Sequence, residues 1–85
     1  MTCTEIDIVH NDSNFELPDF PYPIYVNVYD IGTKEGKKKG WAIKNEWGAR
    51  KDPFIVCYKD GIVIKAFYSE ADNNIVKSLI EYLND

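Results

Sequence analysis

Two short segments of the chain alternate apolar and polar residues, and both predict β-strands. Residues 5–10 (EIDIVH) carry β-branched residues at every second position, and residues 24–29 (IYVNVY) place Val26 and Val28 on one face with polar or aromatic residues on the other. Between these segments, residues 11–23 hold three of the four prolines and several turn-forming residues. This stretch therefore predicts a loop without a helix.

The middle of the chain predicts a polar connection and then a short helix. Residues 30–39 are polar, contain two glycines and carry the lysine run 37–39, which we interpret as a solvated loop or as the start of a helix. Residues 40–47 (GWAIKNEW) space their two tryptophans and Ile43 as on one face of a helix. Gly48 follows as the expected stop signal.

A β-hairpin and an amphipathic helix are predicted for the last third. Residues 53–58 (PFIVCY) predict a strand with proline at its first position, residues 59–61 (KDG) a tight turn, and residues 62–68 (IVIKAFY) the returning strand. Residues 73–83 repeat apolar residues at intervals of three and four, which is typical of an amphipathic helix. Asp72 or Asn73 is the expected N-cap of this helix.

The order of these elements predicts one fold class. Strand, loop, strand, helix, strand, strand and helix follow one another along residues 1–85, and no internal repeat or linker divides them. Helices that alternate with strands early, followed by a late hairpin, indicate an α/β (α+β) fold. We expect a single domain with a mixed sheet of about four strands and two helices.

From Ile24 onward the spacing of turn and apolar residues resembles the C-terminal half of a thioredoxin. The matching features are a strand ending in Asp30, the segment Trp47-Gly48-Ala49-Arg50, a proline at position 53, and the hairpin turn Lys59-Asp60-Gly61. The resemblance implies a minimal thioredoxin-like domain with a cis bond between Asp52 and Pro53. It also implies that the main chain of Asp52 pairs with an extended peptide by strand addition.

The N-terminal part departs from the thioredoxin pattern, since members of that family follow the first central strand with Cys-x-x-Cys at a helix N-terminus. Residues 11–14 contain no cysteine, and only nine residues separate Asn14 from Ile24, fewer than a helical crossover needs. Either a loop crosses in place of the first helix or the first strand lies elsewhere. The glycine that the family places after the fourth strand is replaced by Ser69 and Glu70.

Composition and charge exclude several classes of protein. The net charge is −4, which argues against a nucleic-acid partner because such binding depends on neutralising phosphates. No apolar run approaches the roughly 20 residues that cross a bilayer, and no secretory signal is recognisable, so we expect no membrane partner. Two distant cysteines are typical of a reducing compartment, which predicts a cytoplasmic protein. Abundant Ile, Asn, Lys and Tyr suggest AT-rich coding, as in a low-GC bacterium or one of the phages that infect it. A phage product would lie in the host cytoplasm or the virion.

The remaining chemistry-bearing residues form no recognisable catalytic or metal-binding motif. His10, Asp12 and Cys3 are too few and too scattered for a zinc site, so we expect no metal and no cofactor. A single histidine without a matching serine and acid excludes a hydrolytic triad, and no phosphate-binding glycine loop is present. Cys57 should fill the core, whereas Cys3 is expected to be a terminal thiol at the wrong end of the sheet for redox chemistry. His10 is expected at the surface or half-buried.

An aromatic cluster before the second predicted strand has two interpretations. Phe15, Phe20, Tyr22, Tyr25 and Tyr29 either cover the sheet where the missing helix would lie or form an exposed patch for protein binding. The sequence leaves both open.

We therefore expect a non-catalytic thioredoxin-like module that binds protein or forms a homo-oligomer, such as a structural or accessory component of a phage particle. The expected contact edge comprises Asn11, Asp12, Ser13, Asn14, Trp47, Arg50, Asp52 and Pro53. The alternative is a redox protein of the glutaredoxin or thioredoxin kind that acts through a single cysteine. A small regulator with an enzyme or nucleic-acid partner is a third hypothesis, and the acidic charge disfavours its nucleic-acid form.

Overall fold

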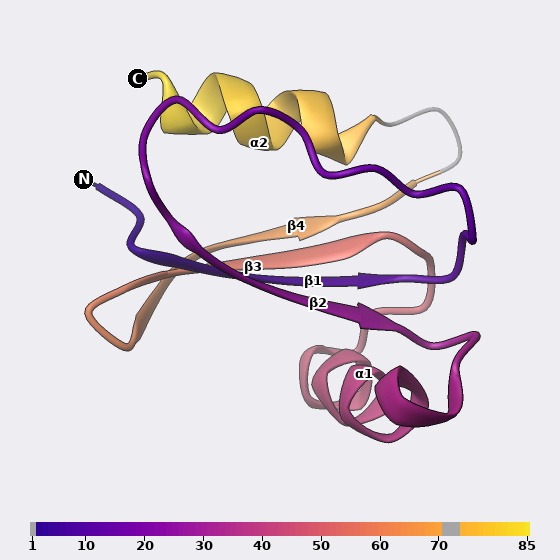
Figure 1. Cartoon of the computed structure of the whole chain (residues 1–85). Helices are drawn as coiled ribbons and strands as arrows, with labels where there is room; N and C mark the ends of the chain where they lie inside the picture. The colour runs from indigo at the N-terminus through magenta and orange to yellow at the C-terminus, as the bar shows by residue number, and fades with distance from the viewer. Residues whose placement is uncertain (1, 71–73) are drawn as a thin grey trace.

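The computed structural model describes residues 2–70 and 74–85 of the chain, and its six elements are shown in Figure 1. They are strands β1 (Glu5–His10) and β2 (Tyr25–Asp30), helix α1 (Lys34–Trp47), strands β3 (Phe54–Lys59) and β4 (Ile62–Tyr68), and helix α2 (Ile75–Leu83). The predicted mixed α+β class and the predicted order of strands and helices are confirmed. The strand boundaries agree with the predictions to within one residue.

One four-stranded mixed sheet with the order β2-β1-β3-β4 organises the molecule. β1 pairs with β2 in parallel, and it pairs with β3 antiparallel on its other side; β3 and β4 form the hairpin. The parallel pair is joined by the irregular segment 11–24, which runs over the sheet beside α2 (Figure 1). Of the two arrangements left open by the sequence, the loop crossing is therefore the one observed.

The core is divided between the two faces of the sheet. On one face, β1 and β3 contribute Ile6, Ile8, Ile55 and Cys57 to a cluster that α2 covers, and Phe15, Phe20 and Tyr22 of the crossing segment pack against it. On the other face, α1 covers a smaller cluster centred on Val9, Phe54 and Val56. Most of the aromatic cluster thus covers the sheet, whereas Tyr25 remains 81% exposed.

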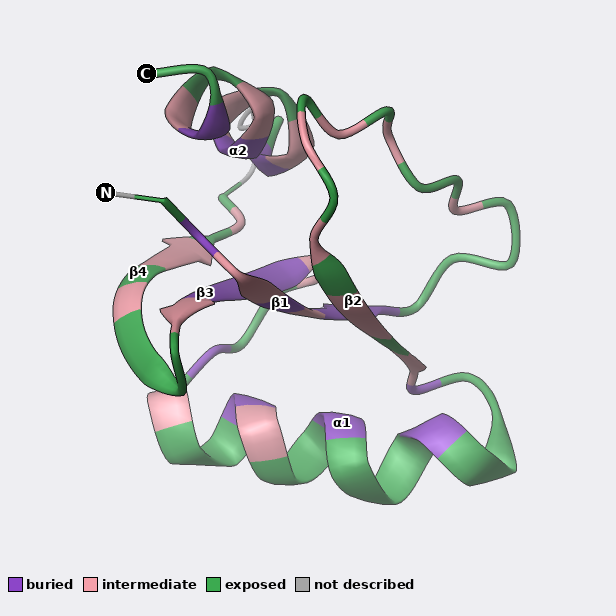
Figure 2. Cartoon of the chain, turned by 60° about the vertical axis from the view of Figure 1, so that its left-hand side comes forward, coloured by how far each residue is buried: buried purple, intermediate pink, exposed green. Residues whose placement is uncertain are grey.

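Helix α1 is longer than the sequence predicts, because it begins at Lys34 and not at residue 40. Thr33 is its N-cap, and its side-chain oxygen accepts a hydrogen bond from the N–H of Gly36. The lysine run therefore lies in the helix, on its exposed surface (Figure 2). The buried side of the first two turns consists of Gly36 and Gly40, so it has no apolar periodicity from which the helix could be recognised.

The turns and caps follow the sequence signals. Asp60 and Gly61 have φ values of 51° and 83°, as the two central residues of a type I′ hairpin turn require, and Gly48 ends α1 with φ of 68°. The N-cap of α2 is Asn74, one or two residues later than predicted, while Asp72 and Asn73 lie outside the described residues. Within the described chain, neither helix has the length and apolarity needed to cross a membrane.

Candidate functional site

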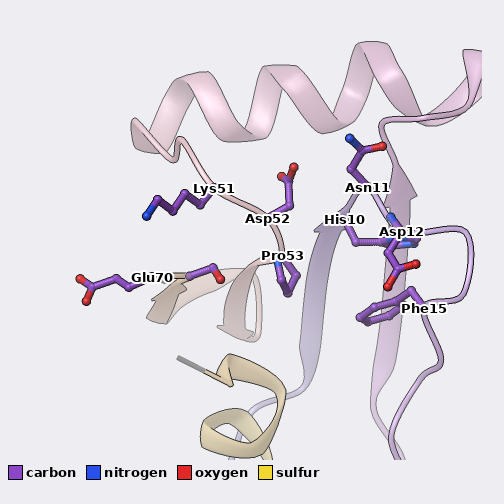
Figure 3. Close-up of a pocket in the computed structure, with 9 residues that line it drawn as sticks. His10, Asn11, Asp12, Phe15, Lys51, Asp52, Pro53 and Glu70 are labelled. Carbon is purple, nitrogen blue, oxygen red and sulfur yellow. Dashed lines mark hydrogen bonds between the residues drawn. The ribbon is translucent and has the colours of Figure 1, made fainter. Parts of the chain in front are cut away.

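A pocket of about 580 Å³ lies where three strand ends meet at one end of the sheet (Figure 3). Because β3 runs antiparallel to β1, and β4 antiparallel to β3, the end of β1, the start of β3 and the end of β4 converge there. The lining residues come from these three places in the chain: His10, Asn11, Asp12, Phe15, Lys51, Asp52, Pro53, Ser69 and Glu70.

His10 and Phe15 form one wall of the pocket. Their rings stack with centroids 4.4 Å apart and planes inclined by 17°. Nδ1 of His10 accepts a hydrogen bond of 3.2 Å from the main-chain N–H of Asp12, so this nitrogen carries no proton in the observed arrangement. His10 is only 7% exposed, which corrects the prediction of a surface or half-buried residue, since the Phe15 ring covers it.

The loop after β1 is held in shape by Asp12. Its carboxylate accepts a hydrogen bond of 2.9 Å from the N–H of Asn14, and its carbonyl accepts one of 3.0 Å from the N–H of Phe15. These bonds turn the chain back so that the Phe15 ring reaches His10. The loop therefore presents a fixed edge to the pocket.

A partly buried ion pair anchors the opposite wall. Nζ of Lys44, on α1, lies 2.5 Å from Oδ1 of Asp52, and the lysine side chain is 1% exposed against 24% for the aspartate. Nζ also lies 4.5 Å from the centroid of the Trp41 ring. Figure 3 shows the Asp52 carboxylate directed toward α1, away from the pocket centre. The ion pair thus fixes the side chain of Asp52 and leaves its main chain at the pocket.

Asp52 and Pro53 line the pocket side by side. The Asp52–Pro53 peptide bond is cis. Within residues 2–70 and 74–85, no hydrogen bond reaches the main-chain N–H or C=O of Asp52. A main-chain donor and acceptor at a pocket edge are the groups with which an extended peptide pairs.

The structure brings half of the predicted site residues together. Asn11, Asp12, Asp52 and Pro53 line the pocket, and Ser13 and Asn14 belong to the same loop without lining it. Trp47 packs instead against Phe54 on the sheet face that α1 covers, with the two ring centroids 6.3 Å apart. The Trp47 carbonyl accepts a hydrogen bond from the Tyr68 hydroxyl. Arg50 is exposed and does not line the pocket.

Sequence reasoning missed five lining residues: His10, Phe15, Lys51, Ser69 and Glu70. The signal that would have found most of them is topological, because residues just after β1, just before β3 and just after β4 must meet at one end of the sheet once the pairing is known. Lys51 carries a positive charge, and Asp12 and Glu70 carry negative charges. The pocket therefore offers both hydrogen-bond donors and acceptors to a polar segment of a partner. No three metal-ligating side chains of the described residues gather into a site.

Both thiols lie in the core and away from the pocket. Cys3 and Cys57 are each buried in the cluster under α2, which corrects the prediction that Cys3 is a terminal thiol. Sγ of Cys3 lies 3.2 Å from the carbonyl oxygen of Glu5, to which it donates a hydrogen bond. Burial raises the pKa of the Cys57 thiol, and the neighbouring Cys3 raises it further. A redox cysteine is activated by a lowered pKa, so the raised pKa of Cys57 has the opposite effect.

We expect neither thiol to react with Ellman's reagent in the folded protein at neutral pH, because burial blocks access and disfavours the Cys57 thiolate. Both should react rapidly once urea unfolds the chain. The measurement is the absorbance of released thionitrobenzoate in native buffer and in urea. Rapid native labelling of either cysteine would contradict the expected burial and would revive the single-cysteine hypothesis.

Fold and site together define a small α+β protein with a pocket at one end of its sheet, and no thiol of the described residues lines that pocket. Comparisons with protein-family models, curated proteins and solved structures found no match.

Proposed function

We propose that this protein is a non-catalytic, thioredoxin-like module that binds an extended segment of a partner protein in the pocket at the end of β1. One observation carries the proposal: the main chain of Asp52, which pairs with no other described residue, lies at a pocket lined by three segments of the chain. Main-chain hydrogen bonds give a bound extended peptide its affinity, and pockets for its side chains give specificity. The strand order and the turn spacing support the thioredoxin-like assignment.

A binding role is favoured over catalysis by the side chains in the pocket. Asp52 is held in its ion pair with Lys44, and Nδ1 of His10 is occupied by the Asp12 N–H. Neither group is placed beside a nucleophile, since both cysteines lie in the core. A module of this kind suits a component of a larger assembly, such as a phage particle, and the burial of both thiols disfavours the single-cysteine redox alternative.

The pocket proposal is tested by a charge reversal at Lys51. Peptides selected from a random displayed library against the wild-type protein should bind with an affinity that Lys51→Glu weakens by about tenfold, since the variant removes the one cation that lines the pocket among the described residues. Isothermal titration calorimetry measures the change. Amide shifts on peptide addition should map to residues 10–15, 51–53 and 69–70.

Arg50→Glu is the matched control, because Arg50 is adjacent, exposed and subject to the same charge change but does not line the pocket. It should leave peptide affinity within about twofold of the wild-type value. Equal losses in the two variants would indicate long-range electrostatics, not a pocket contact. Selected peptides whose shifts map elsewhere, or the failure to select any peptide, would contradict the proposed site.

A further inference from the structure

β2 is an edge strand whose outer main-chain groups face away from the sheet. The N–H of Tyr25 donates to the carbonyl of Thr4, and the N–H of Ile31 donates to the carbonyl of His10, so odd-numbered residues point their main-chain groups at β1. Because these groups alternate along a strand, the N–H and C=O of Val26 and Val28 point outward. Figure 2 shows β2 as the outermost strand, with α1 on one side and segment 11–24 on the other.

The sequence of this edge reads the same in both directions. Residues 25–29 are Tyr-Val-Asn-Val-Tyr, a palindrome centred on Asn27. If two copies of β2 pair antiparallel about Asn27, Val26 faces Val28, Tyr25 faces Tyr29, and Asn27 faces itself. The outward groups of Val26 and Val28 then exchange both main-chain hydrogen bonds, as a hydrogen-bonded antiparallel pair requires. Sequence symmetry and main-chain direction thus select the same register.

We propose that the protein forms a two-fold symmetric dimer in which β2 pairs antiparallel with β2 of a second copy, joining the two sheets into one. This interface is separate from the pocket at the end of β1. In such a dimer both copies contribute the same surface to the interface, and the two-fold axis passes beside Asn27.

Side-chain shape supports a second copy as the occupant of this edge. Tyr25 is 81% exposed, and the residue it would face, Tyr29, lines a groove of about 340 Å³ between β2 and α1. Each Tyr25 therefore meets the groove of the other copy, and each groove receives one ring. The Asn27 amide does not obstruct the axis, because it turns back toward β1 and donates to the carboxylates of Glu5 and Asp7 at 2.7 and 2.9 Å.

Charge and regularity distinguish β2 from the other edge strand. Residues 25–29 carry no charge although the chain has a net charge of −4, so in the proposed register these five residues of the two copies face one another without opposing like charges. Their register with β1 is uninterrupted over the whole strand. β4, in contrast, contains Lys65 and a register shift opposite Cys57 and Tyr58, and these two features discourage edge pairing.

The test is the oligomeric state of the full chain with a matched pair of lysine variants. Val28 on β2 and Val63 on β4 are 39% and 40% exposed, so the same substitution is made at equal exposure on the two edges. Sedimentation equilibrium should show a wild-type dimer, an increase of about tenfold or more in the dissociation constant for Val28→Lys, and an unchanged constant for Val63→Lys. A wild-type monomer at all concentrations overturns the proposal, as does a dimer that survives Val28→Lys or is lost in Val63→Lys.

A cysteine at the axis tests the register and remains informative if Val28→Lys fails to fold. In the proposed pairing, the Cα atoms of the two copies of residue 27 lie about 4.5 Å apart, which a disulfide can span. Asn27→Cys should therefore form a covalent dimer with oxidised glutathione, shown as a doubled mass in non-reducing electrophoresis. Tyr25→Cys should not, since its two copies are about 14 Å apart.

The wild-type chain, whose own cysteines are buried, is the background for this measurement. Asn27→Cys without cross-linking, or Tyr25→Cys with equal cross-linking, overturns the proposed register. Because neither cysteine variant touches the pocket residues, failure here leaves the peptide-binding measurement on Lys51→Glu to be judged separately.

Discussion

Asp52→Asn is expected to destabilise the protein by about 3–5 kcal/mol, which is a large part of the stability of so small a domain. The reason is the position of Lys44. Its side chain is 1% exposed, and Asp52 is the counter-ion within 2.5 Å of its ammonium. The neutral amide leaves a buried cation without an opposite charge. Lys44→Met should cost less, about 1–3 kcal/mol, because the Asp52 carboxylate is 24% exposed and water can solvate it.

The double variant Lys44→Met/Asp52→Asn decides whether the ion pair or the individual side chains account for these losses. With both charges removed, no buried ion remains, so the double variant should be more stable than Asp52→Asn alone. Urea unfolding followed by far-UV circular dichroism measures all three variants, which avoids fluorescence changes from Trp41 beside Lys44. The role given to the buried ammonium would be contradicted in two cases. One is a double variant whose loss equals the sum of the two single losses, and the other is a smaller loss for Asp52→Asn than for Lys44→Met.

Most of the fold could be predicted from the sequence because its strands and turns carry local signals. The alternation in β1 and β2, the Asp60-Gly61 turn and Gly48 at the end of α1 all depend on residues close in sequence. The start of α1 could not be predicted in this way. Its buried residues there are Gly36 and Gly40, and a helix that packs through glycine lacks the apolar stripe on which periodicity depends.

The pocket was only half predictable for a different reason. Asn11, Asp12, Asp52 and Pro53 are predicted from the places they take in the thioredoxin-like pattern, whereas Ser69 and Glu70 reach the site only through the pairing of β3 with β4. Cys3 illustrates the same limit, because its burial depends on α2 and on the crossing segment, both distant in sequence. Proximity to a chain end says little about exposure when a late helix covers that end.

Gly36→Ala is expected to destabilise the protein by about 1–3 kcal/mol, although alanine is the better helix former by about 1 kcal/mol. A Cβ atom on Gly36 would lie 2.7 Å from the main-chain nitrogen of Asp30 and 2.9 Å from its carbonyl carbon, at the end of β2. Backbone atoms in a paired strand cannot give way as a side chain can. The added methyl group must therefore move α1 away from the sheet.

Two matched variants separate this clash from helix propensity. At Gly40, a Cβ atom would meet Cγ2 of Ile31, a side-chain atom 2.5 Å away, so Gly40→Ala should cost less than Gly36→Ala. Lys38→Ala, on the exposed side of the same helix, should change the free energy of unfolding by no more than about 0.5 kcal/mol. Urea unfolding of the three variants measures the change in their free energies of unfolding and so gives the order of these changes. If Gly36→Ala stabilises the protein, helix propensity outweighs packing at this position, and the close contact between α1 and β2 is not what selects glycine there.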